Sequence, residues 1–195
     1  HGELGWYLAL GGETPRVIAA DVIPLPLAKA KALVAQTGCS DVVECRRGDE
    51  LSVLEPGEAQ DIVVAGLGGE TMANLLARVA WVRDKNVNLV LLPAARGPGL
   101  RKWLCQNGFG IIREVPVKEH GRFYTAILAA YTGEAMEPAP LFYQVGLVPR
   151  TKNEAAAGYV TARLKQLKQK RGAPLDETER AELETLISEV EACLP

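Results

Sequence analysis

Short apolar runs alternate with helical patterns along the first 130 residues of the chain. Aliphatic and β-branched residues concentrate at 16–21, 42–46, 61–65 and 87–92, and these runs predict strands. Residues 27–36, 70–82 and 98–107 have the composition, apolar spacing or end signals of helices. Repeated strand–loop–helix units predict a doubly wound α/β sheet with right-handed crossovers.

The pattern changes after residue 110. Residues 111–117 and 123–131 predict two strands joined by a short turn at His120 and Gly121, which would add an antiparallel hairpin to a mostly parallel sheet. We therefore expect one α/β domain over residues 1–134.

A linker and a two-helix coiled-coil domain are expected over residues 135–195. Prolines are frequent up to residue 149, and helices are then predicted at 153–171 and 176–193. Apolar residues at alternating spacings of three and four predict an antiparallel coiled-coil hairpin. The two seams are formed by Ala157, Val160, Leu164 and Leu167 and by Leu183, Ile187, Val190 and Leu194.

Charge is divided unevenly between these two helices. Residues 150–172 carry seven bases and one acid, whereas residues 173–195 carry one base and seven acids. The helices would attract each other, and the first could also offer a positive ridge to phosphates; the two interpretations are compatible. The candidates for phosphate contact on this ridge are Arg163, Lys165, Lys168, Lys170 and Arg171.

The composition of the 195 residues is that of a globular protein, with 48% hydrophobic and 24% charged residues. The net charge of −2 argues against a generally cationic nucleic-acid wrapper but permits a local basic face. The four cysteines lack zinc-ligand spacing, so we expect reduced thiols in the cytoplasm and no metal. No apolar run reaches the roughly 18 residues of a membrane span, so no membrane association is expected.

Acidic and glycine residues stand where the predicted strands end. Asp21 ends the first strand, Asp49 follows the second, and Gly66 and Gly68 follow the third. Ligands of open α/β sheets bind beyond these strand ends. The Asp21 carboxylate suits ribose hydroxyls because it only accepts hydrogen bonds, and Asp49 suits the exocyclic amine of adenine.

A nicotinamide-binding motif is disfavoured by two positions. Thr71 stands where the third glycine of that motif belongs, and the next strand ends at Leu92 and Pro93 without an acid. S-adenosylmethionine (SAM) suits the pattern better than a nicotinamide cofactor.

The sequence resembles the bacterial tRNA (adenine-22, N1)-methyltransferase family, TrmK, a group of class I SAM-dependent methyltransferases. The resemblance covers essentially the whole chain. The family's first motif is Asp-x-Gly-x-Asp-His, and this sequence begins at its histidine, so we expect the first strand to be missing here. The shared motifs are HGEL at 1–4, GDEL at 48–51, IVVAGLGG at 62–69, LRKWL at 100–104 and GRFY at 121–124.

The resemblance implies a Rossmann-like class I methyltransferase fold and methyl transfer from SAM to N1 of adenine 22 in a tRNA, which releases S-adenosylhomocysteine. His1 and Pro93 are the candidates for the catalytic pocket, and Arg96, Arg101 and Lys102 are further candidates for tRNA phosphates. The implied cofactor-binding residues are Gly2, Asp21, Val22, Gly48, Asp49, Glu50, Ala65, Gly66, Leu67 and Gly68.

One departure from the family leaves the substrate open. The family usually has Gln-Pro-Asn after the fourth strand, whereas this chain has Leu92-Pro93-Ala94. A class I methyltransferase with another substrate is therefore an alternative. A second alternative is a non-catalytic tRNA-binding protein on a degenerate methyltransferase scaffold. The main interpretation predicts a monomeric, cytoplasmic bacterial protein with tRNA as its partner.

Overall fold

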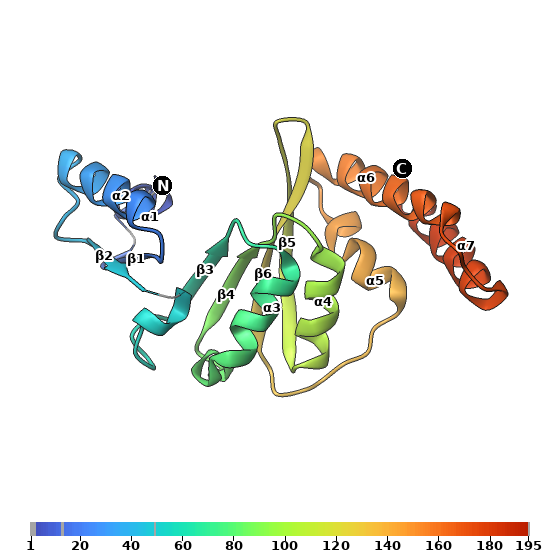
Figure 1. Ribbon diagram of the computed structural model, residues 1–195, viewed down its shortest axis with the longest axis horizontal. Coiled ribbons are helices and arrows are strands. Elements are labelled where there is room, and N and C mark those ends of the chain that lie inside the picture. The colour runs from blue at the N-terminus through green and yellow to red at the C-terminus, as the bar shows by residue number, and fades with distance from the viewer. Residues whose placement is uncertain (1–2, 13, 49, 195) are drawn as a thin grey trace. The chain divides into compact units, whose positions relative to one another are not determined.

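A computed structural model describes residues 3–12, 14–48 and 50–194 (Figure 1). The chain divides into two compact units, residues 1–58 and 59–195. The boundary that we expected at residue 134, between the α/β domain and the C-terminal helices, stays a prediction.

The first unit is a small parallel α/β arrangement. Its elements are helix α1 (Glu3–Leu10), strand β1 (Val17–Asp21), helix α2 (Pro24–Gln36) and strand β2 (Val43–Arg47). β1 and β2 pair in parallel. Val34, Cys39 and Val43 form their buried core. The two predicted strands and the helix between them are confirmed to within a few residues.

The second unit contains a four-stranded sheet in the order β3-β4-β6-β5. β3 (Asp61–Ala65) and β4 (Asn88–Leu92) are parallel, whereas β6 (Arg122–Tyr131) is antiparallel to both β4 and β5 (Phe109–Glu119). The predicted antiparallel hairpin is therefore confirmed. His120 and Gly121 both have positive φ, as a two-residue hairpin turn of type I′ requires.

Helices α3 (Gly69–Arg78) and α4 (Gly97–Gln106) lie next to each other over one face of this sheet (Figure 1). Alternate strand residues on the covered face are fully buried, including Leu89, Leu91 and Ile127. α3 ends earlier than predicted, because Val79 has an extended backbone and a 3-10 turn follows it.

Three helices form the C-terminal part of the second unit. α6 (Ala155–Gln169) and α7 (Glu177–Glu191) were predicted, whereas the short helix α5 (Pro140–Val145) lies in the expected linker. All three contribute to one hydrophobic cluster, and α6 also packs on β5 and β6. The apolar seam that was predicted between α6 and α7 therefore also contacts apolar residues of α5.

Most of the predicted seam residues are buried in this cluster, but Ala157 is exposed.

No helix in the part of the chain that the structure describes combines the length and the apolar character that a membrane span needs.

Candidate functional site

Two loops meet at the carboxyl ends of β3 and β4. The amide of Ala94 donates to the carbonyl oxygen of Leu67 at 2.9 Å, and the amide of Gly69 donates to the carbonyl oxygen of Ala95 at 2.8 Å. Parallel neighbouring strands end at the same edge of a sheet, which is where ligands of such folds bind. The two loops thus form one continuous backbone floor at this edge.

Two glycines of this floor are required for different physical reasons. Gly66 has a φ of 81°, and no atom lies within 4 Å of the position where a Cβ would stand. A Cβ on Gly69 would lie 2.4 Å from the carbonyl oxygen of Arg96. Gly66 is therefore needed for its left-handed backbone and Gly69 for the close approach of the second loop.

A pocket of about 350 Å³ opens beside this floor. It is bounded by the β4–α4 loop, the start of β6 and one side of α6. Pro93 is buried in its wall, and Phe123 and Tyr124 add aromatic surface. The described lining residues include no Asp, Glu or His. The pocket can therefore orient and enclose a ligand, but it offers no carboxylate or imidazole for proton transfer.

Three arginines line the same pocket. Arg96 and Arg122 are exposed, and the Arg96 guanidinium pairs with Glu70. Arg163 is partly buried, and burial lowers the pKa of its guanidinium, with the neighbouring Arg101 acting in the same direction. The pocket therefore has a positively charged wall, which suits an anionic group.

In the first unit, Asp21 ends β1 as predicted. One of its carboxylate oxygens accepts a hydrogen bond from the amide of Ile23 at 2.8 Å. The amide of Gly48 donates to the Asp21 carbonyl oxygen at 3.4 Å, so the two predicted strand-end residues are neighbours. Val22 is 54% exposed.

Three of the predicted site residues, His1, Gly2 and Asp49, lie outside the described residues. Glu50 begins a short 3-10 turn that ends at Val53. The described candidates in the second unit, from Ala65 to Gly68, all belong to the backbone floor or lead into it. The roles of these residues in cofactor binding stay predictions.

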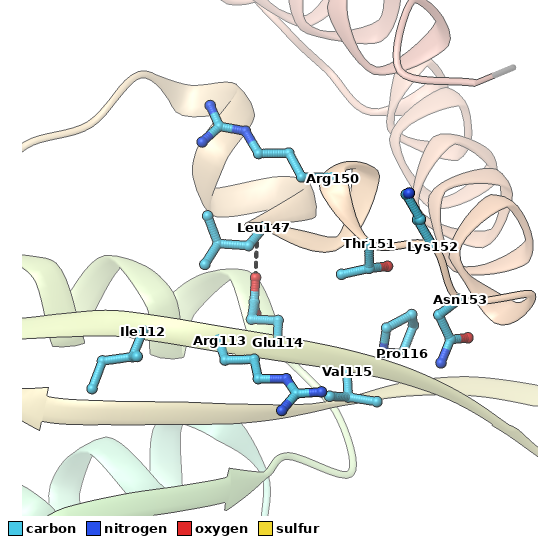
Figure 2. Close-up of a pocket in the computed structure, with 10 residues that line it drawn as sticks. All are labelled: Ile112, Arg113, Glu114, Val115, Pro116, Leu147, Arg150, Thr151, Lys152 and Asn153. Carbon is cyan, nitrogen blue, oxygen red and sulfur yellow. Dashed lines mark hydrogen bonds between the residues drawn. The ribbon is translucent and has the colours of Figure 1, made fainter.

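The prediction that Arg101 contacts a tRNA phosphate is wrong. Its side chain is fully buried, and Nε donates to Glu114 Oε1 at 2.8 Å. Its Nη2 atom donates to the Tyr159 hydroxyl at 2.9 Å. The second Glu114 oxygen accepts from the amide of Leu147 at 2.5 Å, as Figure 2 shows. Arg101 therefore joins α4, β5 and α6 inside the protein.

Some of the basic side chains of the predicted ridge on α6 form ion pairs with acidic side chains of α7. Lys168 pairs with Glu191, and Arg171 pairs with Glu184 at 2.5 Å. These contacts support the interpretation in which the two helices attract each other. The remaining candidates outside the pocket, Lys102, Lys165 and Lys170, are exposed. Whether they contact RNA stays a prediction.

A second concavity, of about 510 Å³, lies between the edge strand β5 and the segment before α6 (Figure 2). Its wall includes three basic residues that were not predicted as site residues: Arg113, Arg150 and Lys152. No local signal in the sequence brings these residues together, because 113 and 150 meet only through tertiary packing.

The pocket next to the floor also contains residues that the sequence analysis did not select. Arg122 belongs to the GRFY motif, so a signal for it was present. Thr125, Tyr159 and Gln166 carried no such signal. They come from β6 and α6, which are distant in sequence from the floor.

Comparison with known proteins supports the fold and the family. A family model described as a methyltransferase domain matches residues 1–127. A tRNA (adenine(22)-N(1))-methyltransferase of Bacillus subtilis is 30% identical over 129 residues, which are 66% of this chain and 54% of that protein. The chain thus spans about half the length of this curated relative.

Solved structures share the fold over nearly the whole chain. The crystal structure of the B. subtilis M1A22 tRNA methyltransferase TrmK is 26% identical, with a TM-score of 0.75, and the match covers 97% of this chain and 85% of that one. Streptococcus pneumoniae Sp1610 in complex with S-adenosyl-L-methionine is 24% identical, with a TM-score of 0.83, over 100% of this chain and 88% of that one. Together with the family model, these likenesses identify the chain as a member of the methyltransferase domain family.

Proposed function

We propose that this protein is a SAM-dependent methyltransferase that methylates N1 of adenine 22 in a tRNA. The observation that carries the proposal is a glycine-dependent floor at the strand ends beside a pocket with a cationic and aromatic wall. The similarity to the B. subtilis enzymes named above supports this substrate. The proposed protein is a bacterial, cytoplasmic monomer that acts on tRNA.

The residues present are suited to SAM. Asp21 uses one carboxylate oxygen in its local turn, which leaves the other for a ribose hydroxyl. Gly66 has open space beside its Cα, so a ligand can approach its backbone closely. We assign the ribose to Asp21 and the adenine amine to Asp49, and we assign the floor to Gly66, Leu67 and Gly68. When bound, SAM supplies an electrophilic methyl group on a sulfonium.

The pocket's chemistry agrees with attack by adenine N1. This nitrogen has an in-plane lone pair, so the nucleophile needs no general base. The described pocket residues provide none, and their task is to orient the base and exclude water. Orientation of this kind can lower a barrier by roughly 7–11 kcal/mol. The target base must leave its stack, and Pro93 with its neighbours would bound the space that receives it. His1 is the other candidate for a contact to the base.

The test is methylation of bulk bacterial tRNA by the natural full-length protein with labelled SAM. The modified nucleotide is then located by digestion and mass spectrometry. We expect 1-methyladenosine at position 22. Methylated tRNA without this nucleotide at position 22 would contradict the assignment.

A methyltransferase with another substrate is the second candidate. It is favoured by Leu92 and Ala94, which offer apolar side chains where the related family has a glutamine and an asparagine. Labelling of total nucleic acid and of protein in parallel separates the two candidates. A chain that binds tRNA but shows no heat of SAM binding in calorimetry would instead be a non-catalytic binding protein.

A further inference from the structure

Arg163 lies in the wall of the 350 Å³ pocket and has no carboxylate partner among the residues that the structure describes. Its Nη2 atom donates to Gln144 Oε1 at 2.6 Å, and Nη1 donates to the side chain of Gln166. Both partners are neutral amides. Its Nε atom is buried and has no hydrogen-bond partner among the described residues. Two of the five N–H donors of this guanidinium therefore have partners within the described part of the chain.

The charges near Arg163 do not balance. Arg101 lies close enough to disfavour a second cation electrostatically, and Tyr159 lies near both guanidiniums. Among the described residues, Glu114 is the carboxylate that pairs with Arg101. These two guanidiniums and this carboxylate together carry one net positive charge, in addition to the exposed Arg122 on the same pocket wall. Removing a charge from water without a partner is costly, so this arrangement favours an anionic ligand.

Thr125 provides an independent indication of a ligand. It lines the same pocket and is 3% exposed, and its hydroxyl has no hydrogen-bond partner among the described residues. Buried hydroxyl groups in native proteins are nearly always hydrogen-bonded. A hydroxyl without a hydrogen-bond partner and a guanidinium bonded to neutral amides, both in one pocket of the described residues, are the pattern of a site that binds an oxyanion.

We infer that Arg163 and Thr125 form a phosphate subsite that holds one backbone phosphate of the RNA substrate. The inference rests on the proposed function. The planar guanidinium matches the oxygens of a phosphate. Phe123 and Tyr124 line the same pocket and give the attached nucleotide an aromatic surface. The volume is at the low end of ligand pockets, which suits a single nucleotide and excludes a duplex.

The test compares tRNA binding by Arg163→Met and Thr125→Val with that of the unaltered full-length protein. Fluorescence anisotropy over a series of salt concentrations gives both affinity and salt dependence. Arg163→Met should weaken binding about tenfold or more. A plot of log affinity against log salt concentration has a negative slope. Arg163→Met should make this slope less steep by about 0.7–0.9, the value for one phosphate contact. Thr125→Val should weaken binding about threefold or more without lowering the melting temperature.

Arg83→Met is the matched control. Arg83 is also partly buried, but it precedes β4 at the opposite end from the pocket. Its substitution should leave both tRNA affinity and salt slope unchanged. Equal tRNA binding by Arg163→Met and Arg83→Met would overturn the inference. So would an unchanged tRNA affinity of Thr125→Val, measured on protein whose melting temperature equals that of the unaltered protein.

Two further measurements identify the source of the anion. SAM affinity should be the same in Arg163→Met and the unaltered protein; a loss of SAM affinity would assign the arginine to the cofactor carboxylate and overturn the inference. Millimolar inorganic phosphate should compete with tRNA. Thermal stabilisation by phosphate without such competition would also overturn it.

The failure of this inference can be told apart from failure of the proposed function. Formation of 1-methyladenosine at position 22 with Arg163-independent binding would refute the subsite alone. Arg163-dependent tRNA binding without this product would refute the proposed function and leave the subsite supported.

Discussion

The Nε atom of Arg101 donates to Oε1 of Glu114 over 2.8 Å, and neither side chain has solvent-exposed surface. The pair joins α4 to β5, and the other Glu114 oxygen holds the backbone at Leu147, just after α5. Gly146 makes this approach possible, because a Cβ there would lie 1.7 Å from Glu114 Oε2. The pair therefore connects the sheet to the C-terminal helices that form one wall of the pocket.

Arg101→Met should lower the free energy of unfolding by about 3–5 kcal/mol, because it leaves the Glu114 carboxylate buried and unpaired. Urea unfolding measures the effect. Arg171→Met is the control: it breaks a solvent-exposed pair with Glu184, which water screens, and should lower the stability much less than Arg101→Met does. The double variant Arg101→Met with Glu114→Leu should recover most of the stability. A single-variant loss below about 1 kcal/mol would show that the pair is not structurally important.

The floor glycines should respond differently to alanine. Gly69→Ala should cost about 1–3 kcal/mol of stability and lower the methylation rate, because it pushes against the Arg96 carbonyl. Gly66→Ala should cost about 1–2 kcal/mol through its positive φ alone. Gly68→Ala should change stability by less than about 0.5 kcal/mol, since its φ is −70° and the nearest atom lies at 4.0 Å. Equal effects at all three positions would contradict this account.

Asp21→Ala should weaken SAM binding about tenfold or more, because it removes a charged hydrogen-bond acceptor for the ribose. Isothermal titration calorimetry measures the affinity. Asp21→Asn separates this role from the local turn, since the amide oxygen can still accept from the amide of Ile23. It should bind SAM more weakly than the unaltered protein but better than Asp21→Ala. Unchanged affinity in both variants would limit Asp21 to the turn.

Arg46 should determine how the stability of the first unit falls at acidic pH. Its hydrogen bonds are the main reason why the pKa of both Glu44 and Glu58 is lowered from 4.5 to about 2. Because the folded pKa is depressed, the stabilisation is present above pH 4.5 and is lost as the pH falls towards 2. Arg46→Met should move both pKa values towards 4.5, and its stability deficit should shrink over this pH range.

Carboxyl carbon NMR titration of Glu44 and Glu58 checks this prediction. Arg16→Met is the control, because Arg16 donates to Glu44 at 2.7 Å and to Glu58 only at 3.2 Å. Arg16 accordingly lowers the pKa of Glu44 more strongly than that of Glu58. It should therefore raise the pKa of Glu44 more than that of Glu58. Titration of Glu58 near pH 4.5 in the unaltered protein would refute the role of Arg46.

The order of strands and helices was largely predictable from the sequence. β3 has the predicted bounds, and the turn at His120 and Gly121 joins β5 to β6 as expected. Such features depend on apolar spacing and on local backbone preference. Helix α5 was missed because it has only six residues and depends on burial of Tyr143 and Val145 for its stability.

The candidate site was predictable only in part. Strand-end residues such as Asp21 and Gly66 could be selected, because the topology of parallel strands brings such ends to one edge. The environments of the arginines could not be predicted from the sequence. The sequence made both Arg101 and Arg163 candidates for phosphate contact, yet Arg101 is fully buried and Arg163 lies in a pocket wall.

The sequence by itself therefore determined the alternation of elements, the hairpin and the residues at the strand ends, since each follows from neighbours within a few positions. Only the tertiary structure decided which charges are paired and which residues share a pocket. Arg101 meets Tyr159 across 58 positions of the chain. Contacts of that range depend on how whole elements pack, and no local pattern of residues encodes them.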